Sequence, residues 1–186
     1  MLNIDQARAL MHEWTDGESL RRHMESVAAC MAGYAAIHEP DQLDRWVVAG
    51  LLHDFDYEKH PSAEEHPFIG VEHLRSNNLV DDEIIDAILG HAEYTGTPRE
   101  SMMSKCLFAV DELAGFIVAC AKVRPNGIAD LGAKSVKKKL KDKAFAAAVN
   151  RSDIDEGIES LEVDKTEHID RCISFIRDWD RPIVGD

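Results

Sequence analysis

The sequence is short of basic residues relative to its acidic content. Across 186 residues it carries 21 lysine and arginine residues against 35 aspartate and glutamate residues, which gives a formal net charge of −14. A general nucleic-acid-binding surface needs many lysine and arginine side chains to neutralise phosphates. The charge balance therefore argues against nucleic acid as a partner, and any anionic substrate must be met by local groups.

Long apolar runs and paired cysteines are missing as well. No apolar run approaches the roughly 20 residues that span a bilayer, and residues 1–14 lack the cationic stretch and apolar core of a secretory signal. The four cysteines, Cys30, Cys106, Cys120 and Cys172, stand singly without a CxxC pair. We therefore expect buried free thiols, a cytoplasmic location and no membrane partner.

Strand-like alternation is scarce, whereas apolar residues recur at helical spacing along most of the chain. The predicted fold class is therefore all-α. At this length we expect a single domain over residues 1–186, with a helical core at about 18–125 and a C-terminal helical extension at about 128–182.

Caps, prolines and polar turns indicate where the helices begin and end. A helix over 18–38 should end before Pro40, because a proline disfavours helix in its predecessor. Asp41 is expected to cap a helix over 42–55, and Asp81 or Asp82 to cap one over 81–94. Further helices are predicted over 66–78, 100–122, 128–150, 151–161 with Ser152 or Asp153 as cap, and 164–179. The polar segment 56–65 is predicted to be a loop.

Two carboxylates lie in apolar helical surroundings. Asp54 follows His53 directly at the end of the apolar run 46–52, and Asp111 lies inside the apolar helix over 105–121. A carboxylate buried there without a partner would cost several kcal/mol. Each of these aspartates must therefore be paired or must bind a metal ion.

Three further histidines, His23, His66 and His91, stand beside or within apolar helical patterns. Taken singly, each is more often an ordinary hydrogen-bonded helix residue than a ligand. Taken together with His53, four inward imidazoles in one small domain would each need a separate polar partner. Four imidazoles and two carboxylates form a ligand set for a pair of divalent ions of the iron, manganese or zinc kind.

The order of these residues resembles the HD superfamily of metal-dependent phosphohydrolases, in particular its two-metal, HDIG-like subgroup. The resemblance covers about residues 20–125 and rests on a first histidine, the His53-Asp54 doublet, a histidine in an "HPxxG" context, a histidine at a helix end and a downstream aspartate. It implies a single compact helical bundle with the metal site at its centre. One ion would be held by His23, His53, Asp54 and Asp111, and the other by Asp54, His66 and His91, with Asp54 as the bridge.

Other histidines and one aspartate need a separate interpretation. His73 competes with His66 because the two share a helix face, and the "HPxxG" match favours His66. His12, His38 and His168 are interpreted as surface or structural residues. Many two-metal relatives continue the doublet with Ile-Gly, whereas this chain has Phe55-Asp56. Asp56 is expected either to hydrogen-bond a ligand histidine or to shape the pocket, so the substrate of relatives cannot be transferred.

The expected chemistry is hydrolysis. Two divalent ions bridged by one carboxylate lower the pKa of a water between them and polarise phosphoryl oxygens. We therefore predict a phosphohydrolase that cleaves a phosphate ester of a nucleotide or another small phosphorylated metabolite. Iron or manganese is expected, with magnesium, cobalt, nickel or zinc as alternatives. Lys59 and His60, in the loop after the doublet, are candidates for gripping phosphate or supplying the acid, although an ordinary solvated loop has the same composition.

A lysine cluster offers a second candidate for substrate binding. Six lysines lie between Lys134 and Lys143, and helical spacing places Lys134, Lys137, Lys138 and Lys141 on one face. Lys137, Lys138 and Lys141 are predicted to meet substrate phosphates, with a solvated face as the equal alternative.

Two other functions use the same residues. A minority of two-metal proteins that resemble this ligand set are mixed-valence diiron oxygenases, and the ligands alone do not separate oxygenase from hydrolase. A non-catalytic sensor of a phosphorylated ligand would be favoured by loss of ligand residues, but all six positions are present. The oligomeric state is left open because no heptad pattern indicates a coiled-coil partner.

Overall fold

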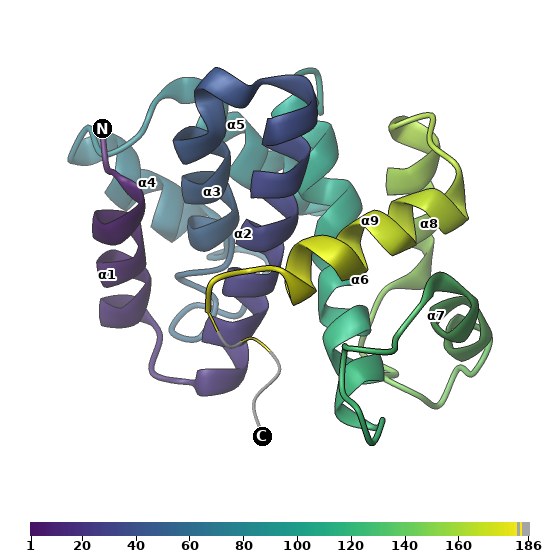
Figure 1. Cartoon of the computed structure of the whole chain (residues 1–186). Helices are drawn as coiled ribbons and strands as arrows, with labels where there is room; N and C mark the ends of the chain where they lie inside the picture. The colour runs from purple at the N-terminus through teal and green to yellow at the C-terminus, as the bar shows by residue number, and fades with distance from the viewer. Residues whose placement is uncertain (182, 184–186) are drawn as a thin grey trace.

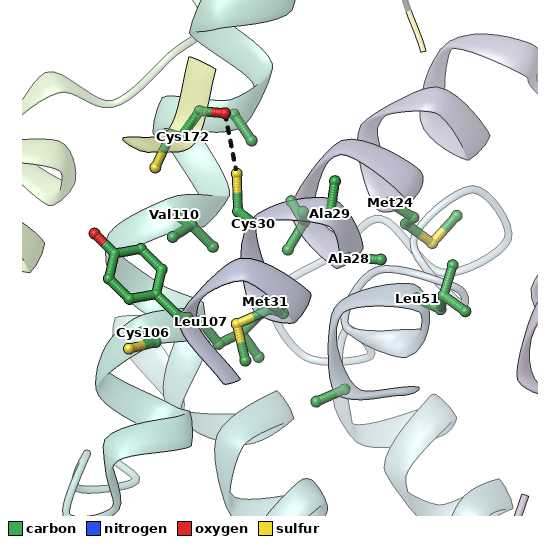
Figure 2. Close-up of a cluster of buried hydrophobic side chains, with 14 of the residues drawn as sticks. Met24, Ala28, Ala29, Cys30, Met31, Leu51, Cys106, Leu107, Val110 and Cys172 are labelled. Carbon is green, nitrogen blue, oxygen red and sulfur yellow. Dashed lines mark hydrogen bonds between the residues drawn. The ribbon is translucent and has the colours of Figure 1, made fainter. Parts of the chain in front are cut away.

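Two long helices form the framework of the protein. The computed structural model describes residues 1–181 and 183, and within them α2 (Glu18–His38) and α6 (Met102–Lys122) pack against each other. Helix α3 (Leu43–Leu52) lies along α2. Figure 2 shows part of the buried core between these helices, with side chains such as Met31 from α2, Leu51 from α3 and Leu107 from α6.

The remaining helices cover this framework from two sides (Figure 1). Helix α1 (Ile4–Trp14) packs on α3, and α5 (Asp82–His91) packs on α6 and contacts α4 (Phe68–Ser76). On the other side, α8 (Arg151–Ser160) packs on α6, while α9 (Lys165–Arg177) contacts α2, α6 and α7 (Ala133–Leu140). Short 3-10 turns lie at η1 (Pro40–Gln42) and η2 (Glu93–Thr95).

The described residues form nine α-helices and no strand, so the all-α prediction is confirmed. None of these helices combines the length and apolar content needed to cross a bilayer. All four cysteines are free and buried, as expected, and the thiol of Cys30 points at the backbone carbonyl of Cys172 (Figure 2). The assignment of α7 to α9 to an extension of a single domain stays a prediction.

Several predicted helix ends are confirmed. Helix α2 ends at His38, before Pro40, and α6 ends at Lys122. Asp81 caps α5 by accepting the backbone N–H groups of Glu83 and Ile84, and Asp164 caps α9 in the same way. Helix α1 was not predicted individually.

Several predicted caps and helix boundaries are wrong. Asp41 does not cap α3, because Pro40 starts a 3-10 turn that contains Asp41 and α3 begins only after Gln42. The cap of α8 is Asn150 rather than Ser152 or Asp153. Helix α7 ends at Leu140 instead of continuing to residue 150.

The early end of α7 has a physical reason in Arg151. Its guanidinium donates hydrogen bonds to the backbone carbonyls of Ala146 at 3.1 Å, Val149 at 2.8 Å and Asp142 at 3.3 Å. Carbonyl groups that would otherwise need helical partners are thereby satisfied in an irregular segment. Ala146 adopts a positive φ of 45°, which interrupts a helix.

Candidate metal centre

The His53-Asp54 doublet lies at the end of α3, in the interior of the bundle. The His53 side chain is fully buried, and its Nδ1 lies 2.8 Å from the carbonyl oxygen of Gly50 one turn earlier. Because a carbonyl only accepts, Nδ1 carries the hydrogen and the lone pair of the neutral ring is on Nε2. The helix end therefore fixes both the direction and the tautomer of this imidazole.

Two other histidines are held in the same way. His91 is the last residue of α5, and its Nδ1 donates to the carbonyl oxygen of Ile88. His66 precedes α4, and its Nδ1 donates to Asp56 Oδ1 at 2.7 Å. In the neutral form of both rings Nε2 therefore carries the lone pair, which is the form in which a histidine binds a metal ion.

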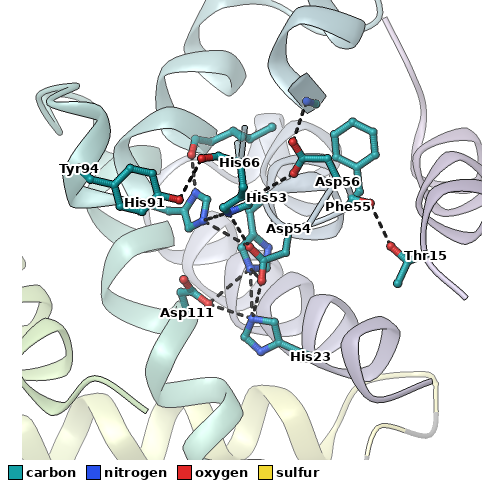
Figure 3. A network of polar contacts seen from close by, with 12 residues as sticks. Thr15, His23, His53, Asp54, Phe55, Asp56, His66, His91, Tyr94 and Asp111 are labelled. Carbon is teal, nitrogen blue, oxygen red and sulfur yellow. Dashed lines mark hydrogen bonds and ion pairs between the residues drawn. The ribbon is translucent and has the colours of Figure 1, made fainter. Parts of the chain in front are cut away.

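These Nε2 atoms meet in two pairs (Figure 3). His23, from α2, places its Nε2 3.2 Å from that of His53. The Nε2 atoms of His66 and His91 are 3.3 Å apart. Two lone pairs that face each other at this separation repel, and a shared cation removes the repulsion. The donor geometry therefore fits metal binding better than a network of neutral histidines.

Asp54 lies between the two histidine pairs. Its Oδ2 is 3.5 Å from Nε2 of both His23 and His53. Its Oδ1 is 3.3 Å from Nε2 of His66 and 3.4 Å from that of His91. Each oxygen of one carboxylate thus faces one pair of imidazoles, which is the arrangement that a bridging ligand needs.

Asp111 adds a second carboxylate beside the first pair. It comes from the middle of α6, and its Oδ1 lies 2.9 Å from Nε2 of His23 and 3.4 Å from that of His53. Two groups of ligand atoms result, one of His23, His53 and Asp54 and the other of Asp54, His66 and His91, each within 4.8 Å. Nitrogen and carboxylate oxygen donors of this kind suit divalent first-row metals.

The electrostatics of the cluster keep its carboxylates ionised. Burial disfavours a charge on Asp54, but the imidazole of His53 and hydrogen bonds from His66 and His91 hold its pKa well below the usual range. Burial also disfavours a charge on His53, yet the carboxylates of Asp54 and Asp111 raise its pKa well above the usual value of 6.5. Protons and metal ions therefore compete for these ligand atoms, and metal binding must displace the protons.

Asp56 holds the ring of His66 at Nδ1, and Gly70 in turn holds Asp56. Asp56 is fully buried, and its second oxygen accepts the backbone N–H of Gly70 at 2.7 Å. A Cβ on Gly70 would lie 2.9 Å from the Asp56 carboxyl group and 2.6 Å from the ring of Phe55, so the glycine of "HPxxG" permits this close approach. The expectation that Asp56 bonds a candidate ligand histidine is confirmed.

The structure separates His66 from its competitor and from the other histidines. His73 lies against the ring of Trp14, with centroids 4.8 Å apart, and stays outside the cluster. His12 and His38 are exposed. His168 is buried and bonds Tyr34 and the carbonyl of Ala109, so its role is structural. These placements agree with the interpretations made from the sequence.

A cavity of about 740 Å³ opens above the cluster. It reaches His23, Asp54, His66, His91 and Asp111, which are the accessible members of the cluster. The rest of its polar and aromatic lining is not predicted from the sequence and consists of Tyr57, Glu93, Tyr94, Phe108, Glu112, Asn150 and Asp153. The volume is in the range of small-molecule sites.

Two of the missed residues lie next to candidate ligands. The hydroxyl of Tyr94 donates to the backbone carbonyl of His66 at 3.0 Å (Figure 3). Glu112 follows Asp111, and burial together with the Asp111 charge raises its pKa to about 7. The one sequence signal for Glu112 was its place inside an apolar helix beside Asp111.

Lys59 and His60 do not line this cavity. Lys59 donates to the backbone carbonyl of Glu13 at 3.2 Å, and Glu58 accepts two backbone N–H groups from the turn between α1 and α2. Nδ1 of His60 lies 3.4 Å from Glu65 Oε1. Lys59 and Glu58 therefore tie the loop after the doublet to the start of the chain, and neither Lys59 nor His60 reaches the cavity.

The lysine cluster is also outside the cavity. Lys137 donates to Thr166 Oγ1 at 2.7 Å, and together with Lys141 it lines a separate pocket of about 350 Å³ on the side of α7, α8 and α9. Lys138 lines another pocket, beside Cys120. These three lysines do not reach the candidate centre, because α7 packs on α9.

The comparisons with known proteins identify the family. A family model described as HD domain matches residues 20–114, just over half of the chain. The protein therefore belongs to the HD domain family, whose members are generally metal-dependent phosphohydrolases. The match contains all six candidate ligands and ends inside α6, so α8 lies beyond it. No curated protein and no solved structure matches the chain. The two-metal subgroup stays a prediction.

Proposed function

We propose that this protein is a metal-dependent phosphohydrolase that cleaves a phosphate ester of a small phosphorylated metabolite or nucleotide. The observation that carries the proposal is the position of Asp54, whose two oxygens each face one pair of histidine Nε2 atoms at 3.3–3.5 Å. Membership of the HD domain family supports the same class of reaction.

The roles of the residues follow from their contacts. Asp54 would bridge two ions, with His23, His53 and Asp111 on one side and His66 and His91 on the other. A bound pair of divalent ions supplies a hydrolytic nucleophile at neutral pH and offsets charge on the phosphoryl group. Asp54 stays ionised at neutral pH because its pKa is held far below 7.

Other groups orient the ligands and shape the space for substrate. Backbone carbonyls hold His53 and His91, and Asp56 holds His66, so the rings need little reordering when ions bind. The cavity of about 740 Å³ accommodates one small ester. The oriented ligand rings and the size of the cavity therefore favour a small substrate.

The test is release of inorganic phosphate from a panel of phosphomonoesters and nucleotides, with Mn²⁺ or Fe²⁺ supplied. Asp54→Ala should release no phosphate above the background without enzyme, and metal analysis should find both ions lost. Asp41→Ala serves as the matched control, since Asp41 is an exposed carboxylate in η1. It should retain both activity and metal.

Three results would contradict the proposal. Phosphate release by Asp54→Ala at the wild-type rate would remove the bridged centre as the source of activity. Consumption of oxygen with substrate by iron-loaded protein, without phosphate release, would assign the site to oxygenase chemistry instead. Metal-dependent ligand binding without either reaction would favour a sensor.

A further inference from the structure

The wall of the cavity above the candidate ligands is acidic. Besides Asp54 and Asp111, three carboxylates line it, and we refer to Glu93, Glu112 and Asp153 as the carboxylate wall. They come from three separate segments, η2, α6 and α8. Within residues 1–181 and 183, no lysine or arginine lines the cavity.

The charge on this wall is poorly compensated by the protein. Arg99 lies 3.8 Å from Glu93, but it pairs more closely with Glu156. In the described part of the chain, neither Glu112 nor Asp153 has a lysine or arginine within ion-pair distance. Burial and the charges of Glu93, Glu156 and Asp111 raise the pKa of Asp153 despite the opposing charge of Arg99, which indicates crowded negative charge that a cation would relieve.

Aromatic rings stand beside the carboxylates. Tyr57, Tyr94 and Phe108 line the same cavity. The Arg99 guanidinium lies 3.7 Å from the centroid of Phe108, so a cation of the protein already packs on this ring. Carboxylates combined with aromatic faces are the groups that recognise an ammonium ion.

Part of the wall comes from outside the family-matched region. Helix α8, which begins after residue 150, contributes Asp153, and its cap Asn150 also lines the cavity. The helix lies close to α6 at Gly157, where a Cβ would come within 2.5 Å of Ala109 Cα. This close packing holds Asp153 over a centre built by α2, α5, α6, the end of α3 and the segment before α4.

From these features we propose that the substrate is a phosphomonoester whose leaving group carries an ammonium group, as in a phosphorylated amino alcohol. The proposal rests on the proposed function and narrows its substrate class. The phosphoryl group lies at the histidine and aspartate cluster, and the ammonium group lies against the carboxylate wall. Substrates with several phosphates and no cation are disfavoured, because their added negative charge meets unpaired carboxylates.

The first experiment compares two isosteric esters, 2-aminoethyl phosphate and propyl phosphate, which differ by an ammonium group in place of a methyl group. With manganese-loaded wild-type protein, kcat/KM for the amino ester should exceed that for propyl phosphate by at least about tenfold, as expected for charge-assisted hydrogen bonds. Asp153→Asn should remove most of this preference, measured as the ratio of the two kcat/KM values.

Asp155→Asn is the matched control, because Asp155 lies on the same helix but bonds Lys165 and does not line the cavity. The chromogenic ester p-nitrophenyl phosphate separates the two proposals. If it is hydrolysed in an Asp54-dependent way while the two isosteric esters react equally, the ammonium proposal is wrong and the phosphohydrolase stands.

A binding measurement does not depend on turnover. By calorimetry, 3-aminopropylphosphonate should bind the wild-type protein at least about tenfold more tightly than butylphosphonate, and Asp153→Asn should abolish the difference. Equal binding, or no binding of either compound, would overturn the proposal. A third divalent ion per chain that is lost in Asp153→Asn would also overturn it, because the wall would then be a cation site.

Discussion

His66 and Asp56 are joined by a hydrogen bond of 2.7 Å between Nδ1 and Oδ1, and both side chains are buried. The other oxygen of Asp56 accepts the backbone N–H of Gly70, also at 2.7 Å. The carboxylate thus faces two donors and has no hydrogen of its own to offer them. It fixes the ring of His66 and leaves Nε2 free to bind a metal ion.

Asp56→Asn should weaken metal binding without removing a ligand. The carboxamide has one oxygen for two donors, so its NH₂ group must face either His66 Nδ1–H or the Gly70 N–H. We expect metal affinity at the site of His66 and His91 to fall by about 10- to 100-fold, which is typical when a partner of a ligand histidine is lost. Competition with a chromogenic chelator measures this change.

Asp86→Asn is the control for this experiment, because Asp86 is exposed on α5 and does not line the cavity. It should bind metal with wild-type affinity. Equal affinities in Asp56→Asn and wild type would show that the Asp56 bond does not support the centre.

Substitution of two histidines tests the assignment of the second ion. His66→Ala should bind one divalent ion per chain where wild type binds two, because the partner of His91 is removed. His73→Ala should keep both ions, since its ring packs on Trp14 outside the cluster. Metal content is measured by elemental analysis after removal of excess ion. Loss of an ion in His73→Ala with retention in His66→Ala would exchange the two roles.

Most of the centre could be predicted because its residues are conspicuous in the sequence. Asp111 stands inside an apolar helix, and His53-Asp54 ends one, so burial of polar groups was evident without a structure. Asp56 was noticed because it departs from the Ile-Gly that commonly follows the doublet. The carboxylate wall was missed because Glu93 and Asp153 lie 60 residues apart in ordinary polar surroundings.

Contacts between distant segments explain why Lys59 and the predicted lysine cluster lie outside the cavity. Lys59 follows the doublet closely in sequence, but its bond to the Glu13 carbonyl directs it away from the cavity. Helical spacing predicts one face for these lysines, but Lys137 and Lys141 line one pocket and Lys138 lines another. Their neighbours depend on how α7 packs on α9. Hydrogen bonds between distant segments decided both outcomes, and helical periodicity contains no information on them.

The pair of Arg45 and Asp81 predicts a pH dependence of stability. Two bonds of 2.8 Å join the guanidinium to the carboxylate. Partial burial opposes ionisation of Asp81, but Arg45 and the N–H groups of the helix start outweigh it and lower the pKa below 3.8. Because the folded-state pKa is lowered, the stabilisation is complete well above pH 3.8 and disappears as the pH falls through the folded-state value.

Asp81→Asn isolates this effect, since asparagine caps a helix as well as aspartate does. Urea unfolding should show a loss of about 1 kcal/mol at pH 7 and no difference from wild type once the pH is below the lowered pKa. Asp82→Asn, at the exposed neighbouring position, should match wild type at both pH values. A deficit that persists undiminished in acid would assign the effect to the cap instead of the charge.

Gly157→Ala tests the packing of α8 on α6. Alanine is favoured over glycine by about 1 kcal/mol in a helix interior, so this substitution would stabilise a helix that had free space around it. Here the new Cβ would lie 2.5 Å from Ala109 Cα and 2.9 Å from its Cβ, and one helix must move. We expect a net loss of about 1–3 kcal/mol in urea unfolding. A gain in stability would mean that α8 packs less closely on α6, and the position of Asp153 over the candidate centre would lose its support.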